Sequence, residues 1–196
     1  MMFLAKVILR LKLFACLLAV NAPALVADQA ARLSLHAVIA NKGLGCELIL
    51  PENVLQFKPL QSSQLTGAIQ TYQIKPLRVE LNCVDEHEVV LPTLTIEGET
   101  PYASDVDQTI FLNGTPNGVG FMVRQSMDDK PIALAEFYQP AAAISQGGQG
   151  KRLTVLNEDN LYHSDNVLWV GLVGPFQPDI IPGNFQASLT LNVTFE

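Results

Sequence analysis

The side chains of this 196-residue chain that could carry chemistry are its histidines, its cysteines and a few clustered acids. His163 is followed by Ser164 and Asp165, which are the three residue types of a hydrolytic triad. A hydrolase of this kind would also need a nucleophile-elbow motif or a third partner placed far away in the sequence, and neither accompanies the cluster. We therefore predict no hydrolytic site at these residues.

Two further segments contain residue types that occur in ligand sites. The run 85–88 (DEHE) offers carboxylate and imidazole groups that bind metals, but it lies just past Cys83 and is typical of a solvated turn. The glycine-rich run 146–151 (QGGQGK) lacks the spacing and the Ser or Thr of a phosphate-binding loop, so we expect a hairpin turn there. We predict no enzyme activity, no cofactor and no metal.

The first 27 residues have the pattern of an export signal. Three cations and no acid precede the apolar run 13–20 (LFACLLAV), which has the length of a signal-peptide core and is too short to cross a bilayer. Small residues allow cleavage after Ala24 or Ala27, and we favour Ala27 because the chain that follows begins with more polar character. The alternatives are an amphipathic helix of the domain and a lipid anchor at Cys16, although Phe14 fits a lipoprotein cleavage box poorly.

Removal of the signal changes the cysteine count and the charge. It takes away Cys16, three of the 12 cations and none of the 19 anions, which leaves Cys46 and Cys83 in a strongly acidic chain. An even number of cysteines in an exported chain favours one disulfide. The acidic balance argues against a nucleic-acid partner, and an apolar content of 48% excludes a disordered polar chain.

Apolar and polar residues alternate through most of the remaining chain, whereas the apolar stripe of a helix is hard to find. Strands are expected at 47–50, 54–57, 76–83, 89–96, 110–112, 118–124, 153–156 and 167–173. Turn signals such as Asn113-Gly114 separate them, and Pro92 predicts an edge strand or a bulge. Trp169 stands among aliphatic residues and is expected in the core. Many short strands predict a single all-β sandwich.

Two segments alternate almost without interruption. The C-terminal segment places six apolar residues on one face: Phe185, Ala187, Leu189, Leu191, Val193 and Phe195. The N-terminal segment 31–41 does the same with Leu33, Leu35, Ala37 and Ile39. A strand of this kind buries one face and exposes the other. From the spacing alone, 31–41 is expected to be the first strand of its own sandwich.

Four features together resemble the pilus subunits of the chaperone–usher type in Gram-negative bacteria. Cys46 opens the first core strand and Cys83 closes a later one. The run 118–123 (GVGFMV), which precedes Asp128, Pro131 and Ile132, is similar to the family's mid-domain strand and turn. An alternating arm precedes the first cysteine. The C-terminal end carries a glycine and an aromatic ring at the family's spacing, which are Gly183, fourteenth from the end, and Phe195, second from the end.

The chain departs from the family pattern at two residues. Phe195 stands where the family usually has Tyr, so the ring is kept and the hydroxyl is lost. Ala37 stands where the N-terminal arm usually has Gly. Because that glycine meets a shallow part of the acceptor groove in the family, the added methyl group leaves the identity of the partner open.

The resemblance implies a fold and a division of the chain. Family members have an immunoglobulin-like sandwich that lacks its last strand, so a hydrophobic groove lies open beside the C-terminal strand. The chain would then comprise a signal peptide (1–27), an N-terminal donor-strand extension (28–45) and a pilin domain (46–196). A periplasmic chaperone lends a strand to the groove, and the arm of the next subunit replaces that strand at the outer-membrane usher.

The resemblance also implies site residues and partners. The donor residues are Leu33, Leu35, Ala37 and Ile39, and the groove strand contributes Gly183, Phe185, Ala187, Leu189, Leu191, Val193 and Phe195. The chain has a donor arm and no second domain, so we expect a structural subunit of a surface fimbria that supports cell adhesion, and not a tip adhesin. Its expected partners are the chaperone, the usher and neighbouring subunits. The alternative is a self-contained periplasmic or secreted sandwich that binds a small ligand or carbohydrate.

Overall fold

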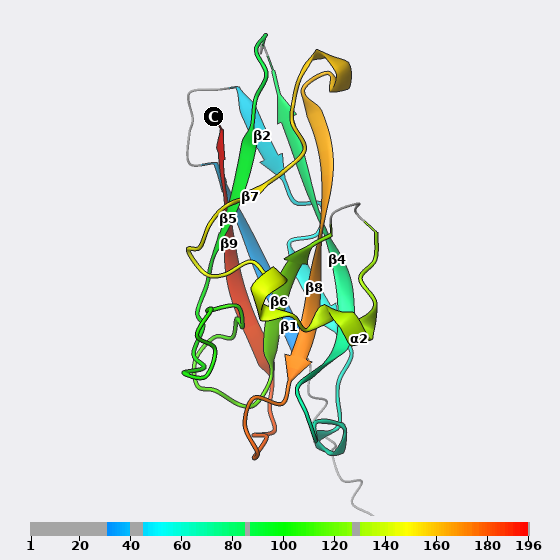
Figure 1. Ribbon diagram of the computed structural model, residues 1–196, viewed down its shortest axis with the longest axis vertical. Helices are drawn as coiled ribbons and strands as arrows, with labels where there is room; N and C mark the ends of the chain where they lie inside the picture. The colour runs from blue at the N-terminus through cyan, green and yellow to red at the C-terminus, as the bar shows by residue number, and fades with distance from the viewer. Residues whose placement is uncertain (1–30, 40–44, 85–86, 127–129, 196) are drawn as a thin grey trace, which may run out of the picture.

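The computed structural model describes residues 31–39, 45–84, 87–126 and 130–195, and they are built mainly from β-strands (Figure 1). The strands are β1 (Ala31–Ile39), β2 (Cys46–Ile49), β3 (Val54–Phe57), β4 (Gln70–Cys83), β5 (Pro92–Glu97), β6 (Gly120–Gln125), β7 (Lys151–Arg152), β8 (His163–Gly174) and β9 (Phe185–Phe195). The short helical turns are α2 (Leu134–Phe137), η1 (Ser62–Gln64), η2 (Pro140–Ala142) and η3 (Glu158–Asn160). Within these residues, no helix has the length and apolar character needed to span a membrane.

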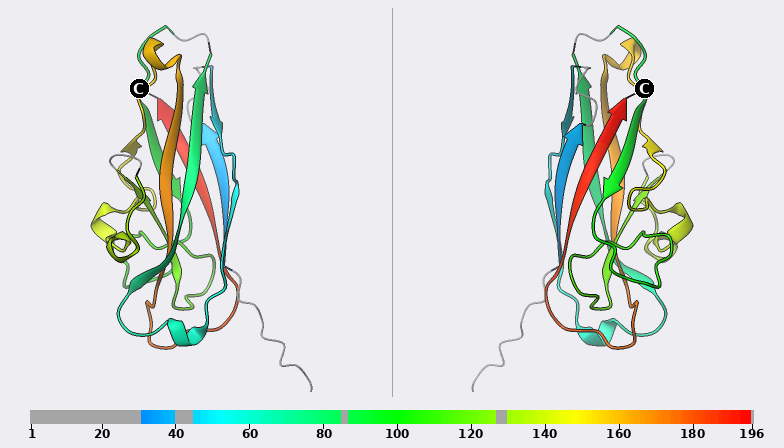
Figure 2. Two further views of the ribbon diagram at one scale, coloured as in Figure 1. Left: turned by 90° about the vertical axis from the view of Figure 1, so that its right-hand side faces the viewer. Right: turned by 90° about the vertical axis from the view of Figure 1, so that its left-hand side faces the viewer.

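The strands form two sheets that face each other (Figure 2). The first sheet has the order β3-β1-β9-β5-β7, and the second has the order β2-β4-β8-β6. Neighbouring strands are antiparallel except β1 and β9, which run parallel. The predicted all-β sandwich is therefore confirmed.

The core lies between the two sheets and follows from strand alternation. The inner face of β9 consists of six buried residues, namely Phe185, Ala187, Leu189, Leu191, Val193 and Phe195. They face buried residues of β4 and β8, which are Leu77, Val79, Leu81, Leu168, Val170 and Leu172. Removal of each large apolar side chain from water contributes roughly 1.5–3 kcal/mol. This burial is what holds the sheets together.

The first part of the described chain crosses from one sheet to the other. Cys46 of β2 lies opposite Cys83 of β4, and a disulfide joins them with 3.9 Å between the Cα atoms. Pro51 follows β2 and has no N–H group to continue the ladder. After it, β3 joins the other sheet by pairing with β1. The disulfide thus anchors the chain just before this crossing.

The segment around α2 covers the outer face of the second sheet. Phe137 packs over Gly171 of β8 so closely that a Cβ atom at Gly171 would meet the ring. The Nη1 group of Arg124 donates hydrogen bonds to the carbonyl oxygens of Glu136 and Phe137, at 2.7 and 2.8 Å. Burial lowers the pKa of the Arg124 guanidinium, and the Glu136 carboxylate acts in the opposite direction.

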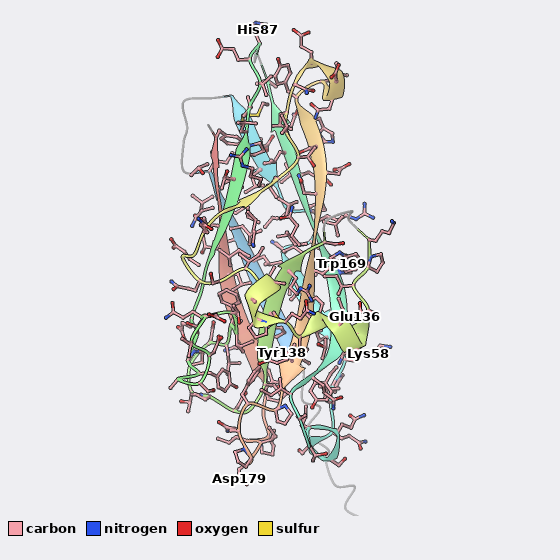
Figure 3. The ribbon with its side chains drawn as sticks, viewed as in Figure 1. Lys58, His87, Glu136, Tyr138, Trp169 and Asp179 are labelled. Carbon is pink, nitrogen blue, oxygen red and sulfur yellow. A yellow bond between two sulfur atoms is a disulfide. The ribbon has the colours of Figure 1, made fainter. Side chains whose placement is uncertain are left out.

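Trp169 was predicted in the core, and it is confirmed only in part: it is half-buried and packs against the core from the outer face of the second sheet. Leu168 and Val170 point inward and are fully buried, so Trp169 points to the opposite face of β8 because strand residues alternate. It is half-buried there, on the side of the sandwich that carries α2 (Figure 3). The continuous apolar run of β8 therefore arises because both faces of the strand are covered.

Two expected strands are reduced to single bridges, and a third does not lie at the predicted edge of the sheet. Residues 110–112 form only a single bridge, between Phe111 and Phe121, and 153–156 only one between Leu156 and Val90. Pro92 begins β5, which is not an edge strand, because β9 pairs on one side and β7 on the other. Proline is tolerated at the first position of a strand, where its missing N–H group costs little.

Candidate functional site

The predicted groove lies beside β9, and β1 of the same chain lies in it (Figure 1). β9 forms one wall through a parallel register that pairs Ala31 with Phe185 and Ile39 with Val193. β3 forms the other wall through an antiparallel register that pairs Ala31 with Phe57. Figure 2 shows β1 and β9, the first and last described strands, side by side. The first and last described strands therefore belong to one sheet.

The first half of β1 is held on both sides. Leu33 lies between Leu55 of β3 and Ala187 of β9 and has no exposed surface. Leu35 is 3% exposed, and its N–H group donates to the carbonyl oxygen of Asn53 at 2.9 Å. Both predicted donor residues in this half therefore fill the groove of their own chain.

The second half of β1 fits less completely. Ala37 is exposed and Ile39 is half-buried, although both belong to the predicted inward face. The reason is that β3 ends its pairing with β1 where Val54 meets Ser34. Because β2, which precedes β3, belongs to the other sheet, no described strand pairs with Ala37 and Ile39 on the side opposite β9.

The wall formed by β3 was not assigned to the site from the sequence. Leu55 is 1% exposed and Phe57 is 4% exposed, and both face the first half of β1. The Phe57 ring also packs against Phe121 with 5.3 Å between centroids. The alternation over 54–57 was the available signal, but it identifies a strand without identifying its neighbour.

The predicted groove strand needs one correction. Its six apolar residues lie on the buried face of β9, but Gly183 lies before the strand and is exposed. Regular pairing starts at Phe185, two residues after Gly183. A Cβ atom at Gly183 would meet no atom within 4 Å, so this glycine has no packing role in the described chain.

The retained position of β1 agrees with the expectation from spacing alone, that 31–41 is the first strand of its own sandwich. Residues 31–39 pair with β3 and β9 of the same chain, and 40–41 lie outside the described residues. Donation of this segment concerns two chains, so it stays a prediction.

The GVGFMV run turns into β6 at one end of the sandwich. Gly118 has a φ of +100°, which favours glycine, and β6 begins at Gly120. The hydroxyl group of Tyr102 accepts from the Gly118 N–H at 3.0 Å and donates to the Val119 carbonyl oxygen at 2.6 Å. Burial raises the pKa of Tyr102, although backbone hydrogen bonds partly oppose this effect. The turn is thus held by a buried phenol.

The candidate triad residues do not converge. His163 Nε2 lies 3.7 Å from Asp165 Oδ1 at the exposed face of β8. Ser164 is buried on the opposite face, where its Oγ atom accepts from Asn166 Nδ2 at 3.0 Å. Alternation along the strand separates the hydroxyl from the imidazole.

The run 85–88, which was expected to be a solvated turn, is described only in part. Asp85 and Glu86 lie outside the described residues, and His87 and Glu88 are exposed. Among the residues that the structure describes, no three metal-ligating side chains form a group.

Comparison with known proteins identifies the fold. No family model matches the sequence, and no curated protein matches it. Among solved structures, the chain is similar to the crystal structure of the P pilus rod subunit PapA, with a TM-score of 0.55 and 16% sequence identity. The alignment covers 78% of this chain and 99% of that chain. The resemblance to pilus subunits is confirmed at the level of the fold: the chain has the β-sandwich fold of a pilus rod subunit.

Proposed function

We propose that this chain is a structural subunit of a surface fimbria and not an enzyme. The single observation that carries the proposal is the groove between β3 and β9, which an N-terminal segment fills as a separate strand. The fold shared with a pilus rod subunit supports the same reading. His163 and Asp165 contact each other at the surface, whereas Ser164 is buried on the opposite face of β8. Within the described residues, these three side chains therefore form no catalytic triad.

The groove between β3 and β9 explains why a subunit without β1 would need a strand from another protein chain. Without β1, the edges of β3 and β9 would lose their pairing, and Leu189 and Leu55 would lose their cover. Unpaired edges and exposed apolar surface invite aggregation. A periplasmic chaperone would supply the first strand, and the arm of a neighbouring subunit would replace it by β-augmentation.

The arm carries the residues that such an exchange requires. Leu33 and Leu35 are buried in the groove of their own chain, so they would also fit the groove of an identical subunit. Burial of each side chain stabilises the filled groove by roughly 1.5–3 kcal/mol. The arm and the groove are different surfaces, so contact between chains is heterologous and extends into an open filament. Export through the periplasm, passage through an outer-membrane usher and support of cell adhesion belong to this proposal.

The test combines two forms of the chain. A variant that begins at Gly45 lacks β1 and serves as the acceptor, and a tagged full-length chain serves as the donor. We expect the donor to capture the acceptor, and we expect a peptide of residues 31–41 to raise the melting temperature of the acceptor. A peptide with Leu33 and Leu35 replaced by Asp is the matched control, because it keeps the length and loses the buried side chains.

One observation favours the alternative function, a self-contained exported sandwich that binds a small ligand or carbohydrate. β1 completes the sandwich within its own chain, as such a protein requires. This alternative predicts that whole chains exchange no strand. An acceptor that stays uncaptured by the full-length donor would therefore contradict the fimbrial proposal.

A further inference from the structure

A pocket of about 260 Å³ lies outside the groove, and none of its lining residues belongs to β1, β3 or β9. Its walls come from the loop after β5, from the residues between α2 and η2, and from the residue Phe176 after β8. All lining residues and their neighbours in the chain are described. Because two aspartates line it, we call it the acidic pocket.

The two carboxylates of the acidic pocket belong to Asp105 and Asp107. Asp105 Oδ2 accepts from the N–H groups of Thr109 and Ile110 at 2.7 and 2.6 Å, and its Oδ1 atom accepts from the Thr109 hydroxyl at 3.1 Å. These bonds fix the carboxylate and leave acceptor capacity, because a carboxylate offers about four lone-pair sites. Asp107 is exposed, and Lys151 lines an adjoining pocket with it. Within the described residues, neither aspartate forms an ion pair.

Two aromatic rings, Tyr138 and Phe176, line the same pocket, with 6.1 Å between their centroids. Phe176 also packs against Tyr102 at 4.9 Å, and its N–H group donates to the Gly118 carbonyl oxygen at 2.9 Å. Burial and the Asp105 carboxylate raise the pKa of Tyr138. The negative charge of Asp105 therefore acts at this ring, and the pocket combines fixed charge with fixed aromatic surface.

The lining of the pocket also includes exposed aliphatic side chains. Val106, which stands between the two aspartates in the sequence, is 88% exposed, and Ile69 is 36% exposed. An aliphatic chain that crosses these residues would remove apolar surface from water on both sides of the contact.

These features select one class of ligand. The two carboxylates attract a cation and repel an anion, and the face of an aromatic ring attracts a cation as well. Within the described residues, no third metal-ligating side chain joins the two aspartates, so the lining suits an organic cation better than a metal ion. The volume lies below the roughly 300–1,000 Å³ of pockets that hold drug-sized molecules, so it fits a group about as large as one side chain.

We propose that the acidic pocket binds an organic ammonium group on an aliphatic stem, which is the chemistry of a lysine side chain and of an alkyl amine. The ammonium group lies by the Asp105 and Asp107 carboxylates and the Tyr138 ring, and the stem covers Val106 and Ile69. The site goes beyond the proposed function and does not depend on it, because none of its residues takes part in the groove.

The test is a titration of the isotope-labelled full-length chain with Nα-acetyl-lysine amide, followed by the NMR chemical shifts of backbone amides. We expect saturable shifts that are confined to the residues around 104–107, 138 and 176. Nα-acetyl-norleucine amide is the matched ligand control, because it keeps an aliphatic stem and lacks the ammonium group, and it should bind at least about fivefold more weakly. Pentylamine identifies the source of the ligand: weaker binding than that of the lysine amide indicates a peptide-borne lysine, and equal or tighter binding indicates a free amine.

Two variants test the contacts in the pocket. Asp107→Asn removes a charge at nearly constant size, and Tyr138→Leu removes a ring, so each should weaken binding of the lysine amide about threefold. Glu88→Gln is the matched control, because it lowers the net negative charge equally at an exposed position by His87, far from Tyr138 (Figure 3), and it should leave the affinity unchanged. The spectrum of each variant verifies that it is folded.

Three results would overturn the proposal. They are binding of the norleucine amide as tight as that of the lysine amide, wild-type affinity in Asp107→Asn, and the absence of saturable shifts at 104–107, 138 and 176. None of them bears on strand exchange, so the proposed function is tested separately.

Discussion

Leu35 of β1 lies opposite Leu189 of β9, and both side chains are buried in the same core, with 3% and 0% of their surface exposed. These residues come from opposite ends of the chain. The burial of the C-terminal strand therefore depends on an N-terminal segment, whichever chain supplies it. Changes at Leu35 should for this reason affect the stability of the whole sandwich.

Leu35→Asp should destabilise the fold by about 4 kcal/mol, because it removes a buried apolar side chain and places a carboxylate without partners in the groove. Urea denaturation followed by circular dichroism measures the change in the free energy of unfolding. His36→Asp is the control, since His36 is exposed on the other face, and its effect should stay within about 0.5 kcal/mol. Equal stability of the two variants would contradict the observed register.

Loss of the disulfide between Cys46 and Cys83 should cost roughly 4 kcal/mol, because the bond closes a loop of 37 residues in the unfolded chain. The double variant Cys46→Ser/Cys83→Ser shows this as a lower urea midpoint than that of the oxidised wild-type chain. Reduced wild-type protein is the matched control and should behave like the double variant. Unchanged stability of both would show that the bond does not constrain the unfolded chain.

Gly171→Ala should destabilise the fold by about 1–3 kcal/mol, because the added methyl group would overlap the Phe137 ring. Gly183→Ala is the control, because nothing lies within 4 Å of the new methyl group, and it should change the free energy of unfolding by less than about 0.5 kcal/mol. Thermal denaturation compares the two. In the presence of Phe137→Leu, Gly171→Ala should cost less, and strict additivity would argue against the contact.

The stability of the fold should decrease in alkaline solution. Burial raises the pKa of Tyr102 above its ordinary value of 10.0, and burial together with the Asp105 carboxylate raises the pKa of Tyr138. Above that ordinary value the unfolded chain releases these protons while the folded chain keeps them. The free energy of unfolding is therefore unaffected by these groups at neutral pH and falls as the pH rises through their unfolded pKa values.

Urea denaturation between neutral pH and about pH 11 measures this decrease. Tyr102→Phe should show a shallower decrease, to which Tyr138 still contributes. At neutral pH the same variant should lose about 1 kcal/mol, because the hydrogen bond to the Val119 carbonyl oxygen is absent. If the free energy of unfolding of Tyr102→Phe falls as steeply with pH as that of the wild-type chain, Tyr102 is not a cause of the alkaline decrease.

Much of the site was accessible from the sequence because its signals are local. The period of two over 185–195 predicted which six residues of β9 are buried, and the same period predicted Leu33 and Leu35. The signal failed at Ala37, which has the right spacing but lies past the last pairing with β3. A residue on the apolar face of a strand is buried only if the neighbouring strand extends far enough to cover it. The extent of β3 depends on residues 54–57, which are distant from Ala37 in the sequence.

The sequence by itself determined most of the long strands, the single sandwich and the candidate disulfide, because alternation and cysteine number are properties of the chain alone. It also determined that each strand has two faces. Only the tertiary structure decided that Trp169 lies on the outer face of the second sheet, and that Leu35 meets Leu189 in a parallel register between β3 and β9. The physical reason is that strand pairing joins residues far apart in the chain, so a partner is selected by the burial that the complete fold achieves.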